Sequence, residues 1–144
     1  MTALDPLSKE IVDLHNFFTE WFTGTVSKDQ LEPRFLSRLH ADMQIITPEG
    51  QVMTRDALKV GFGKGYGSNP DFRIKISDVT IRHQRGGVIV ATYREWQKGA
   101  ANSAFTNSAR AATVVMEMTD PPTWLHVHET WLPEEVRAAG TVDF

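Results

Sequence analysis

The N-terminal part of the chain, up to Gly24, has apolar positions that recur every three or four residues, which is the period of an α-helix. Asp5 can cap the start of this helix, Pro6 suits its first position, and Gly24 is typical of a helix end. The pattern therefore predicts a helix over residues 5–23. Its apolar stripe is wide and aromatic, so it needs a large apolar partner, most simply a curved sheet. The stripe consists of Leu7, Ile11, Leu14, Phe17, Phe18, Trp21 and Phe22.

A second, shorter helical pattern begins at Ser27, and Pro33 is expected to break or restart it. Its apolar face consists of Leu31, Phe35, Leu36 and Leu39. The next segment, MQIIT (43–47), predicts a strand. A turn at residues 48–50 and a short return strand over 51–53 are expected to follow.

Thr54 suits the N-cap of a further helix that begins at Arg55 and directs Leu58 and Phe62 inward. This pattern dissolves into GFGKGYG (61–67), which holds four of the ten glycines of the chain. The segment lacks the spacing of a phosphate-binding loop. We expect a mobile loop over the mouth of a pocket, with Phe62 and Tyr66 as its aromatic contacts.

Beyond Phe72 the apolar positions alternate with the period of a β-strand. A change of parity at Ser77-Asp78 predicts a β-bulge, and Gly86-Gly87 predicts a hairpin turn. Helices followed by an antiparallel run of strands indicate an α+β protein with helices on one face of the sheet. The expected strands cover residues 72–82, 88–97, 110–118 and 124–132.

Both faces of the last strands carry apolar side chains. Residues 88–97 place Ile89, Ala91 and Tyr93 on one face, and Val88, Val90 and Trp96 on the other. In the last strand, alternation places Trp124 on the opposite side from Val127. An antiparallel sheet with one solvated face would alternate cleanly between apolar and polar residues. We therefore expect a second copy of the chain to cover the face that the helices leave open.

Length and composition restrict the class of protein further. The chain of 144 residues predicts a single domain over 1–144, large enough to bury its own core. A net charge of -3 argues against a nucleic-acid partner, and the absence of cysteine excludes disulfides and thiolate chemistry. No apolar run approaches about 18 residues, so no membrane partner is expected. MTALDPLSKE lacks the pattern of a secretory signal, so we expect a cytoplasmic protein.

His126 and His128 share one face of the last strand, because their spacing of two matches the strand period. Two such histidines could hold a metal ion, but the sequence offers no third ligand, so we expect neither a metal nor another cofactor. His128 is a candidate general base, and His126 is a candidate ligand contact. Alternatively, both histidines are hydrogen-bonded within the sheet or at a contact between two subunits.

Glu95 is the second candidate for acid–base chemistry. If Tyr93 faces the interior, Glu95 does too, and an apolar surrounding would raise the pKa of its carboxyl toward neutrality. The alternative is a salt bridge from Glu95 to Arg110 on the neighbouring strand. Arg110 could instead receive a ligand carboxylate through two hydrogen bonds, or lie exposed at the start of its strand.

Aromatic side chains could line a pocket for a flat hydrophobic ligand, because aromatic walls suit such molecules. The candidates for this lining are Trp21, Phe62, Tyr66 and Tyr93. Trp21 belongs equally to the core stripe of the first helix. Tyr66 could also donate a hydrogen bond or a proton.

Several segments together resemble the nuclear transport factor 2-like superfamily, which includes the SnoaL-like and ketosteroid-isomerase-like proteins. The resemblance rests on HNFFTEWFTG (15–24), FLSRLHADMQIITPEG (35–50), MTRDAL (53–58), DFRIKISDV (71–79), VIVATYREWQ (88–97), SARAATVVMEM (108–118) and WLHVHETWLP (124–133). The last segment also resembles the closing strand of the association domain of calcium/calmodulin-dependent protein kinase II. The resemblance implies a cone-shaped, strongly curved sheet wrapped around N-terminal helices. This sheet is antiparallel and mixed at one edge. A pocket at the open end and a homodimer through the outer face of the sheet are also implied.

The sequence leaves two main hypotheses for the function. In the first, a dimeric domain binds a small hydrophobic molecule in the cone. In the second, a metal-independent enzyme carries out proton transfer, dehydration or hydrolysis, with Glu95 or His128 as the base and Arg110 or Tyr66 polarising the substrate. A pure assembly domain is a third possibility. The chain has no clear counterpart of the base and oxyanion hole of the ketosteroid isomerases.

Overall fold

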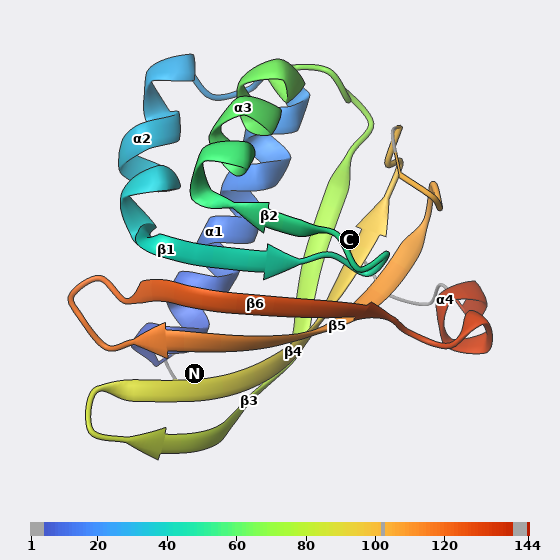
Figure 1. The fold of residues 1–144 in the computed structure, drawn as a ribbon. Helices are drawn as coiled ribbons and strands as arrows, with labels where there is room; N and C mark the ends of the chain where they lie inside the picture. The colour runs from blue at the N-terminus through green and yellow to red at the C-terminus, as the bar shows by residue number, and fades with distance from the viewer. Residues whose placement is uncertain (1–4, 102, 140–143) are drawn as a thin grey trace.

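The computed structural model describes residues 5–101, 103–139 and 144. Figure 1 shows a strongly curved sheet, with the long helix α1 behind it and shorter helices at one end. Within the described ranges, no helix has both the length and the apolarity that crossing a membrane requires. The elements in chain order are α1 (Pro6–Thr23), η1 (Lys28–Gln30), α2 (Leu31–Arg34), η2 (Leu36–Arg38), β1 (Leu39–Ile46), β2 (Val52–Thr54), α3 (Arg55–Gly65), β3 (Arg73–Arg85), β4 (Val88–Lys98), β5 (Ser108–Glu117), β6 (Thr123–Trp131) and α4 (Glu134–Ala139).

Local signals define both ends of α1. The Asp5 carboxylate accepts a hydrogen bond from the Ser8 amide at 2.8 Å, which caps the first turn. Gly24 ends the helix in the left-handed conformation, with a φ of 75°. The expected helix is confirmed, and most of its apolar stripe is buried. Leu7, Ile11, Leu14, Phe17 and Trp21 are at most 4% exposed.

One sheet contains all six strands, in the order β2-β1-β6-β5-β4-β3. Neighbouring strands are antiparallel except β1 and β6, which run parallel. This arrangement confirms an α+β cone whose sheet is antiparallel and mixed toward one edge. β1 begins at Leu39, four residues before the predicted strand, because Leu39 already pairs with Trp124.

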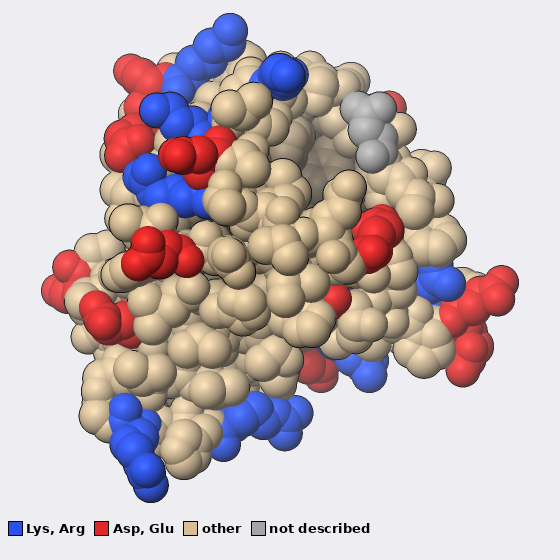
Figure 2. Space-filling model, viewed as in Figure 1, with Lys and Arg blue, Asp and Glu red and all other residues tan. Residues whose placement is uncertain are grey.

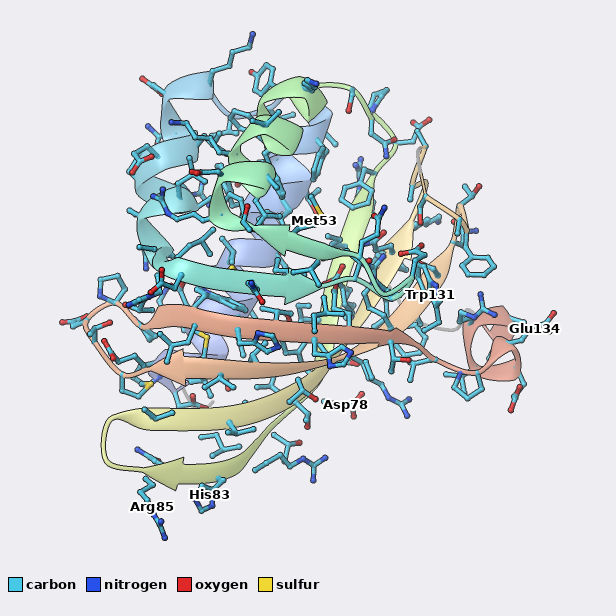
Figure 3. All side chains as sticks on the ribbon, in the orientation of Figure 1. Met53, Asp78, His83, Arg85, Trp131 and Glu134 are labelled. Atoms are coloured by element: carbon cyan, nitrogen blue, oxygen red, sulfur yellow. The ribbon has the colours of Figure 1, made fainter. Side chains whose placement is uncertain are left out.

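The bulge predicted from the change of parity in β3 is present. The register between β3 and β4 shifts between Ser77 and Thr80, and Asp78 has a φ of 58°. Aspartate is among the few residues other than glycine that adopt this conformation readily. Figure 3 labels Asp78 in the middle of the bent β3. The bulge increases the twist of β3 and so contributes to the curvature of the sheet.

A second bulge, in β6, overturns one prediction from the alternation pattern. Val115 pairs with His126, whereas the next residue, Met116, pairs with Trp124. Leu125 is therefore an extra residue in β6, and the parity of the strand changes there. As a result Trp124 and Val127 both lie in the core, at 2% and 4% exposure, although strict alternation would place them on opposite sides.

The glycine-rich segment differs most from its prediction, since α3 continues through it to Gly65. The ring of Phe62 lies 5.1 Å from that of Phe22 in α1 and 4.5 Å from that of Phe35, which directly follows α2. These contacts hold this part of the helix in place. Gly65 permits the close approach, because a Cβ atom there would lie 2.7 Å from the Phe22 ring. The mobile loop expected over 61–67 is thus mostly helix, and packing outweighs the low helix propensity of glycine.

Gly65→Ala is expected to lower the free energy of unfolding by about 1–3 kcal/mol, because the added methyl group overpacks the Phe22 ring. Gly61→Ala and Gly63→Ala are matched controls in the same helix, since neither Cβ would meet an atom within 4 Å. Each control should instead stabilise the protein by up to about 1 kcal/mol. Urea unfolding of the three variants tests this, and equal effects at all three positions would contradict it.

Candidate functional site

A cavity of about 200 Å³ lies inside the cone, between α1 and the sheet. Most of its wall is apolar, and one end is polar. Figure 2 shows the surface hollowed beside α3, at the upper end of the molecule. The apolar wall is formed by Leu14, Phe18, Phe22, Phe35, Leu39, Ile45, Met53, Leu58, Phe62, Phe72, Ile74, Trp124 and Val127.

The polar end is built by four elements that each contribute one charged or titratable side chain. These side chains are His15 from α1, Glu95 from β4, Arg110 from β5 and Glu129 from β6. We call them the polar cluster. The sheet register brings three of them together, since Glu95 is paired with Arg110, and Glu129 is paired with Ala112 two residues further along β5.

His15 and Glu95 form the most buried contact of the polar cluster. His15 Nε2 lies 3.0 Å from Glu95 Oε1, and both side chains are 5% exposed. His15 Nδ1 lies 2.7 Å from the Ile11 carbonyl, which can only accept, so Nδ1 carries a hydrogen. The second oxygen of Glu95 accepts a hydrogen bond from Gln97 Nε2 at 2.6 Å. Both oxygens of the Glu95 carboxylate are therefore occupied.

Arg110 is held more loosely. Its Nη1 donates to Glu129 Oε1 at 3.5 Å, and its Nε lies 3.8 Å from Glu95 Oε2, which is too far for a hydrogen bond. Its guanidinium lies over the ring of Trp131, 4.8 Å from the ring centre. Trp131 is labelled in Figure 3 toward the end of β6. Among the described residues, Arg110 Nε has no hydrogen-bond partner.

Burial and neighbouring charges separate the pKa values of the two carboxyl groups. Burial would raise the pKa of Glu95, but the charges of His15 and Arg110 outweigh it and lower the pKa to about 2. Burial and the charge of Glu95 raise the pKa of Glu129 to about 7. Burial would lower the pKa of His15, but the charge and hydrogen bond of Glu95 raise it overall. Burial also raises the pKa of Tyr93.

The structure places four of the residues singled out in the sequence at this cavity: Glu95, Arg110, Tyr93 and Phe62. Trp21 and Tyr66 lie outside its lining. The Trp21 indole donates to the Phe62 carbonyl at 2.8 Å, and the Tyr66 hydroxyl donates to the Val26 carbonyl at 2.6 Å. The first bond joins α1 to α3, and the second joins the end of α3 to the segment after α1, so both hydrogen bonds serve the fold.

His126 and His128 do not line the cavity either. Val127 and Glu129 face it, and successive residues of a strand point to opposite sides, so the two histidines lie on the outer side of β6. His128 is exposed. Within the described ranges, no group of three or more metal-ligating side chains is arranged to hold an ion. The geometry therefore separates both histidines from the polar cluster.

Reasoning from the sequence missed His15 and Glu129. Each could have been found from the sequence, because each is a polar residue at a position that the pattern assigns to the apolar face. His15 lies one turn after Ile11 on the stripe of α1, and Glu129 lies between Val127 and Trp131 in the strand alternation. A titratable side chain on an apolar face is either paired or functional, and these two are components of the polar cluster.

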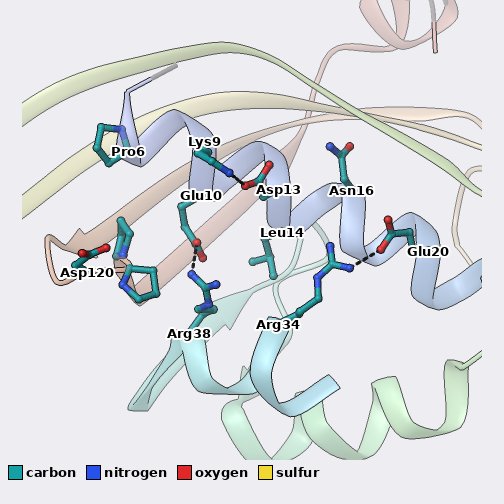
Figure 4. A pocket seen from close by; sticks show the side chains of 12 residues that line it. Pro6, Lys9, Glu10, Asp13, Leu14, Asn16, Glu20, Arg34, Arg38 and Asp120 are labelled. Carbon is teal, nitrogen blue, oxygen red and sulfur yellow. Dashed lines mark hydrogen bonds and ion pairs between the residues drawn. The ribbon is translucent and has the colours of Figure 1, made fainter. Parts of the chain in front are cut away.

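A larger hollow, of about 480 Å³, lies outside the cone between α1, α2 and the loop at Asp120. Figure 4 shows that its charged side chains, apart from Asp120, are already paired with one another. Arg34 donates to Glu20 and Arg38 donates to Glu10, each at 2.7 Å. Because these pairs satisfy each other, this hollow is less suited to a ligand than the cavity in the cone.

No protein-family model and no curated protein matches the chain. Among solved structures, an NTF-2-like protein of unknown function from Pseudomonas aeruginosa is 28% identical, with a TM-score of 0.80 over 90% of this chain and 100% of that one. A proposed ketosteroid isomerase from Shewanella frigidimarina is 16% identical, with a TM-score of 0.62 over 88% and 95% of the two chains. The CamKII hub homology domain of Chlamydomonas reinhardtii is 15% identical, with a TM-score of 0.62 over 90% and 100%. The last two similarities concern the fold alone.

Proposed function

This chain belongs to the nuclear transport factor 2-like superfamily, and from that premise we propose that its cone binds a small, mainly apolar molecule whose polar end contacts the polar cluster. One observation carries this proposal, namely an aromatic cavity that ends at four buried charged or titratable side chains. Pockets of this kind, apolar with a few convergent polar groups, are typical of small-molecule sites. The fold by itself does not select a ligand.

The size of the cavity limits the ligand. A protein cavity of about 150 Å³ lined by apolar side chains can bind benzene. The cavity of about 200 Å³ in the cone therefore has room for one ring and a short polar substituent. Phe18, Phe35 and Phe62 lie within 5.1 Å of one another in ring-centre distance and offer a wall against which such a ring can pack.

The binding proposal predicts that Ile74→Trp abolishes binding by filling the cavity. Ile74 lines the cavity from β3, whereas its neighbour Arg73 is exposed, so Arg73→Trp is the matched control. Isothermal titration with single-ring acids, amides and alcohols should detect binding to the native chain and to Arg73→Trp, and none to Ile74→Trp. Equal binding by both variants, with both folded by circular dichroism, would place the ligand elsewhere.

A second candidate function is metal-independent acid–base catalysis. It is favoured by the two carboxyl groups, because Glu95 remains ionised while Glu129, with a pKa of about 7, can give or take a proton near neutral pH. Glu129 would then be the base, in place of Glu95 and His128, the two candidates from the sequence. Exchange of deuterium from solvent into a bound ketone would support catalysis, provided that Glu129→Gln stops the exchange without abolishing ketone binding.

The outer side of the sheet is the proposed contact with a second copy of the chain. Figure 2 views the molecule onto β1, β6 and β5, and few charged side chains lie in the middle of this view. Val88 is 40% exposed, and Val115 lies on the outer side, since its neighbours Val114 and Met116 are fully buried. Exposed apolar surface of this kind is typical of an interface. Sedimentation of the purified chain at twice the monomer mass would support a dimer.

A further inference from the structure

The hydrogen-bonding capacity of Arg110 is largely unused. A guanidinium has five N–H donors, and the described residues accept only one hydrogen bond from Arg110, the 3.5 Å contact to Glu129. The side chain is nevertheless only 12% exposed, so water satisfies it poorly. A buried cation with free donors is costly unless another group completes its surroundings. Arg110 lines the cavity, so a ligand can supply that group.

The charges of the polar cluster also leave Arg110 without a full counter-ion. Glu95 is bonded to His15 on one oxygen and to Gln97 on the other, so its charge is mainly matched by His15. Glu129 is the remaining partner for Arg110. When Glu129 is protonated, the four side chains carry one net positive charge, because two cations then face one anion.

Resting on the binding function proposed above, we propose that the ligand is a single carboxylic acid in its anionic form, whose carboxylate is held by the unused donors of Arg110. A planar carboxylate matches the two-donor edge of a guanidinium. The protonated Glu129 can in addition donate a hydrogen bond to the carboxylate, and the apolar part of the acid then lies against the aromatic wall. The shape of the cavity and the chemistry of its polar end thus select an amphipathic monoanion.

Binding of such an anion should be linked to the uptake of a proton. The ionisable groups that act on Glu129 are His15 from α1, Glu95 from β4 and Arg110 from β5, and Glu49 acts on Arg110. A second carboxylate beside Glu129 disfavours its ionised form, as Glu95 already does. The affinity for the acid should therefore be constant between about pH 5, above which the acid itself is ionised, and pH 7, and it should fall above pH 7.

The experiment compares acids with their primary amides. Benzoate, phenylacetate and hexanoate, each beside benzamide, phenylacetamide or hexanamide, are titrated calorimetrically into the native chain at pH 6 and pH 8. We expect at least one acid to bind roughly 10- to 100-fold more tightly than its amide at pH 6. Its affinity should fall about tenfold by pH 8, whereas that of the amide should not change.

Three variants show which residues cause the preference for the acid and its pH dependence. Arg110→Lys keeps the charge but loses the two-donor edge, and should remove most of the preference for acid over amide. Glu129→Gln mimics the protonated side chain and should bind the acid at pH 8 as tightly as at pH 6. Ile74→Trp should bind none of the six compounds.

The outcomes separate this inference from the binding function on which it rests. If acid and amide bind equally to the native chain and Ile74→Trp binds neither, the cavity binds ligands but the carboxylate inference fails. If the pH dependence persists in Glu129→Gln, the proton that controls binding belongs to His15, and the role given to Glu129 is overturned. If none of the six compounds binds the native chain at millimolar concentration, both proposals fail.

Discussion

Glu129→Gln should make the protein more stable than the native chain at pH 8, by about 3 kcal/mol in the free energy of unfolding. The pKa of Glu129 is raised to about 7 in the folded protein, from a usual value of 4.5. A shift of this size corresponds to roughly 1.4 kcal/mol for each of about 2.5 pH units. The native chain therefore bears a cost when this buried carboxyl ionises, and the neutral glutamine does not bear it.

The direction in which stability changes with pH follows from the number of protons that the folded and unfolded states bind. Between pH 4.5 and about 7 the folded state holds a proton on Glu129 that the unfolded state has lost, so stability falls as the pH rises. The raised pKa of His15 acts in the same direction above pH 6.5. The lowered pKa of Glu95 acts oppositely, since its stabilisation is full above pH 4.5 and is lost as the pH falls toward 2.

Urea unfolding of the native chain and of Glu129→Gln at pH 4.5, 6 and 8 measures this directly. The two stabilities should nearly coincide at pH 4.5 and diverge as the pH rises. His15 and Glu95 are present in both proteins, so most of their own contribution to the pH dependence cancels in the difference. A constant difference across the three pH values would show that Glu129 titrates normally in the folded state.

Glu95→Leu is expected to cost about 3–5 kcal/mol of stability, because it leaves the buried His15 without its anion and removes one of the two carboxylates near Arg110. Gln97 also loses the acceptor of its 2.6 Å hydrogen bond. The surface pair of Glu20 and Arg34 is the matched control, since its 2.7 Å contact is shorter but its side chains are 42% and 36% exposed. Glu20→Leu should cost less than about 1 kcal/mol.

The double variant His15→Leu/Glu95→Leu tests whether the unpaired charge of His15 causes the loss of stability in Glu95→Leu. Replacing both partners of a buried pair by apolar side chains of similar size is often neutral or even stabilising. The double variant should therefore regain part of the stability lost in Glu95→Leu. If the two single effects simply add, His15 and Glu95 do not interact, and the contact between them is incidental.

The fold was predictable where local signals agree with packing. α1 has a capping residue, Asp5, at its start and a glycine, Gly24, at its end, so its limits follow from the sequence. The bulge at Asp78 follows from a change of parity. The extension of α3 did not follow, because it depends on the contact of Phe62 and Gly65 with residues far away in the sequence.

The site was predictable only in part, because the orientation of a strand residue depends on register. Glu95 and Arg110 could be nominated as a pair from neighbouring strands, and the structure brings them together at the cavity. The orientation of the last strand changes at the extra residue Leu125, and alternation alone cannot locate such an insertion. The sequence therefore left the side of His128 open, and the structure places its neighbour Glu129 at the cavity instead.

The parallel pairing of β1 with β6 has a consequence for synthesis of the chain. Ile45 and Val127 are partners, so forming this pair closes a loop of about 80 residues. On the ribosome, β1 emerges long before β6 exists, while β3, β4 and β5 can pair with their sequence neighbours as they appear. Until β6 is made, the apolar sides of α1 and β1 lack part of their final cover, and we expect a nascent chain at that stage to expose apolar surface that is prone to aggregate. The strand that supplies Glu129 to the cavity is thus also the one that ends this exposed period.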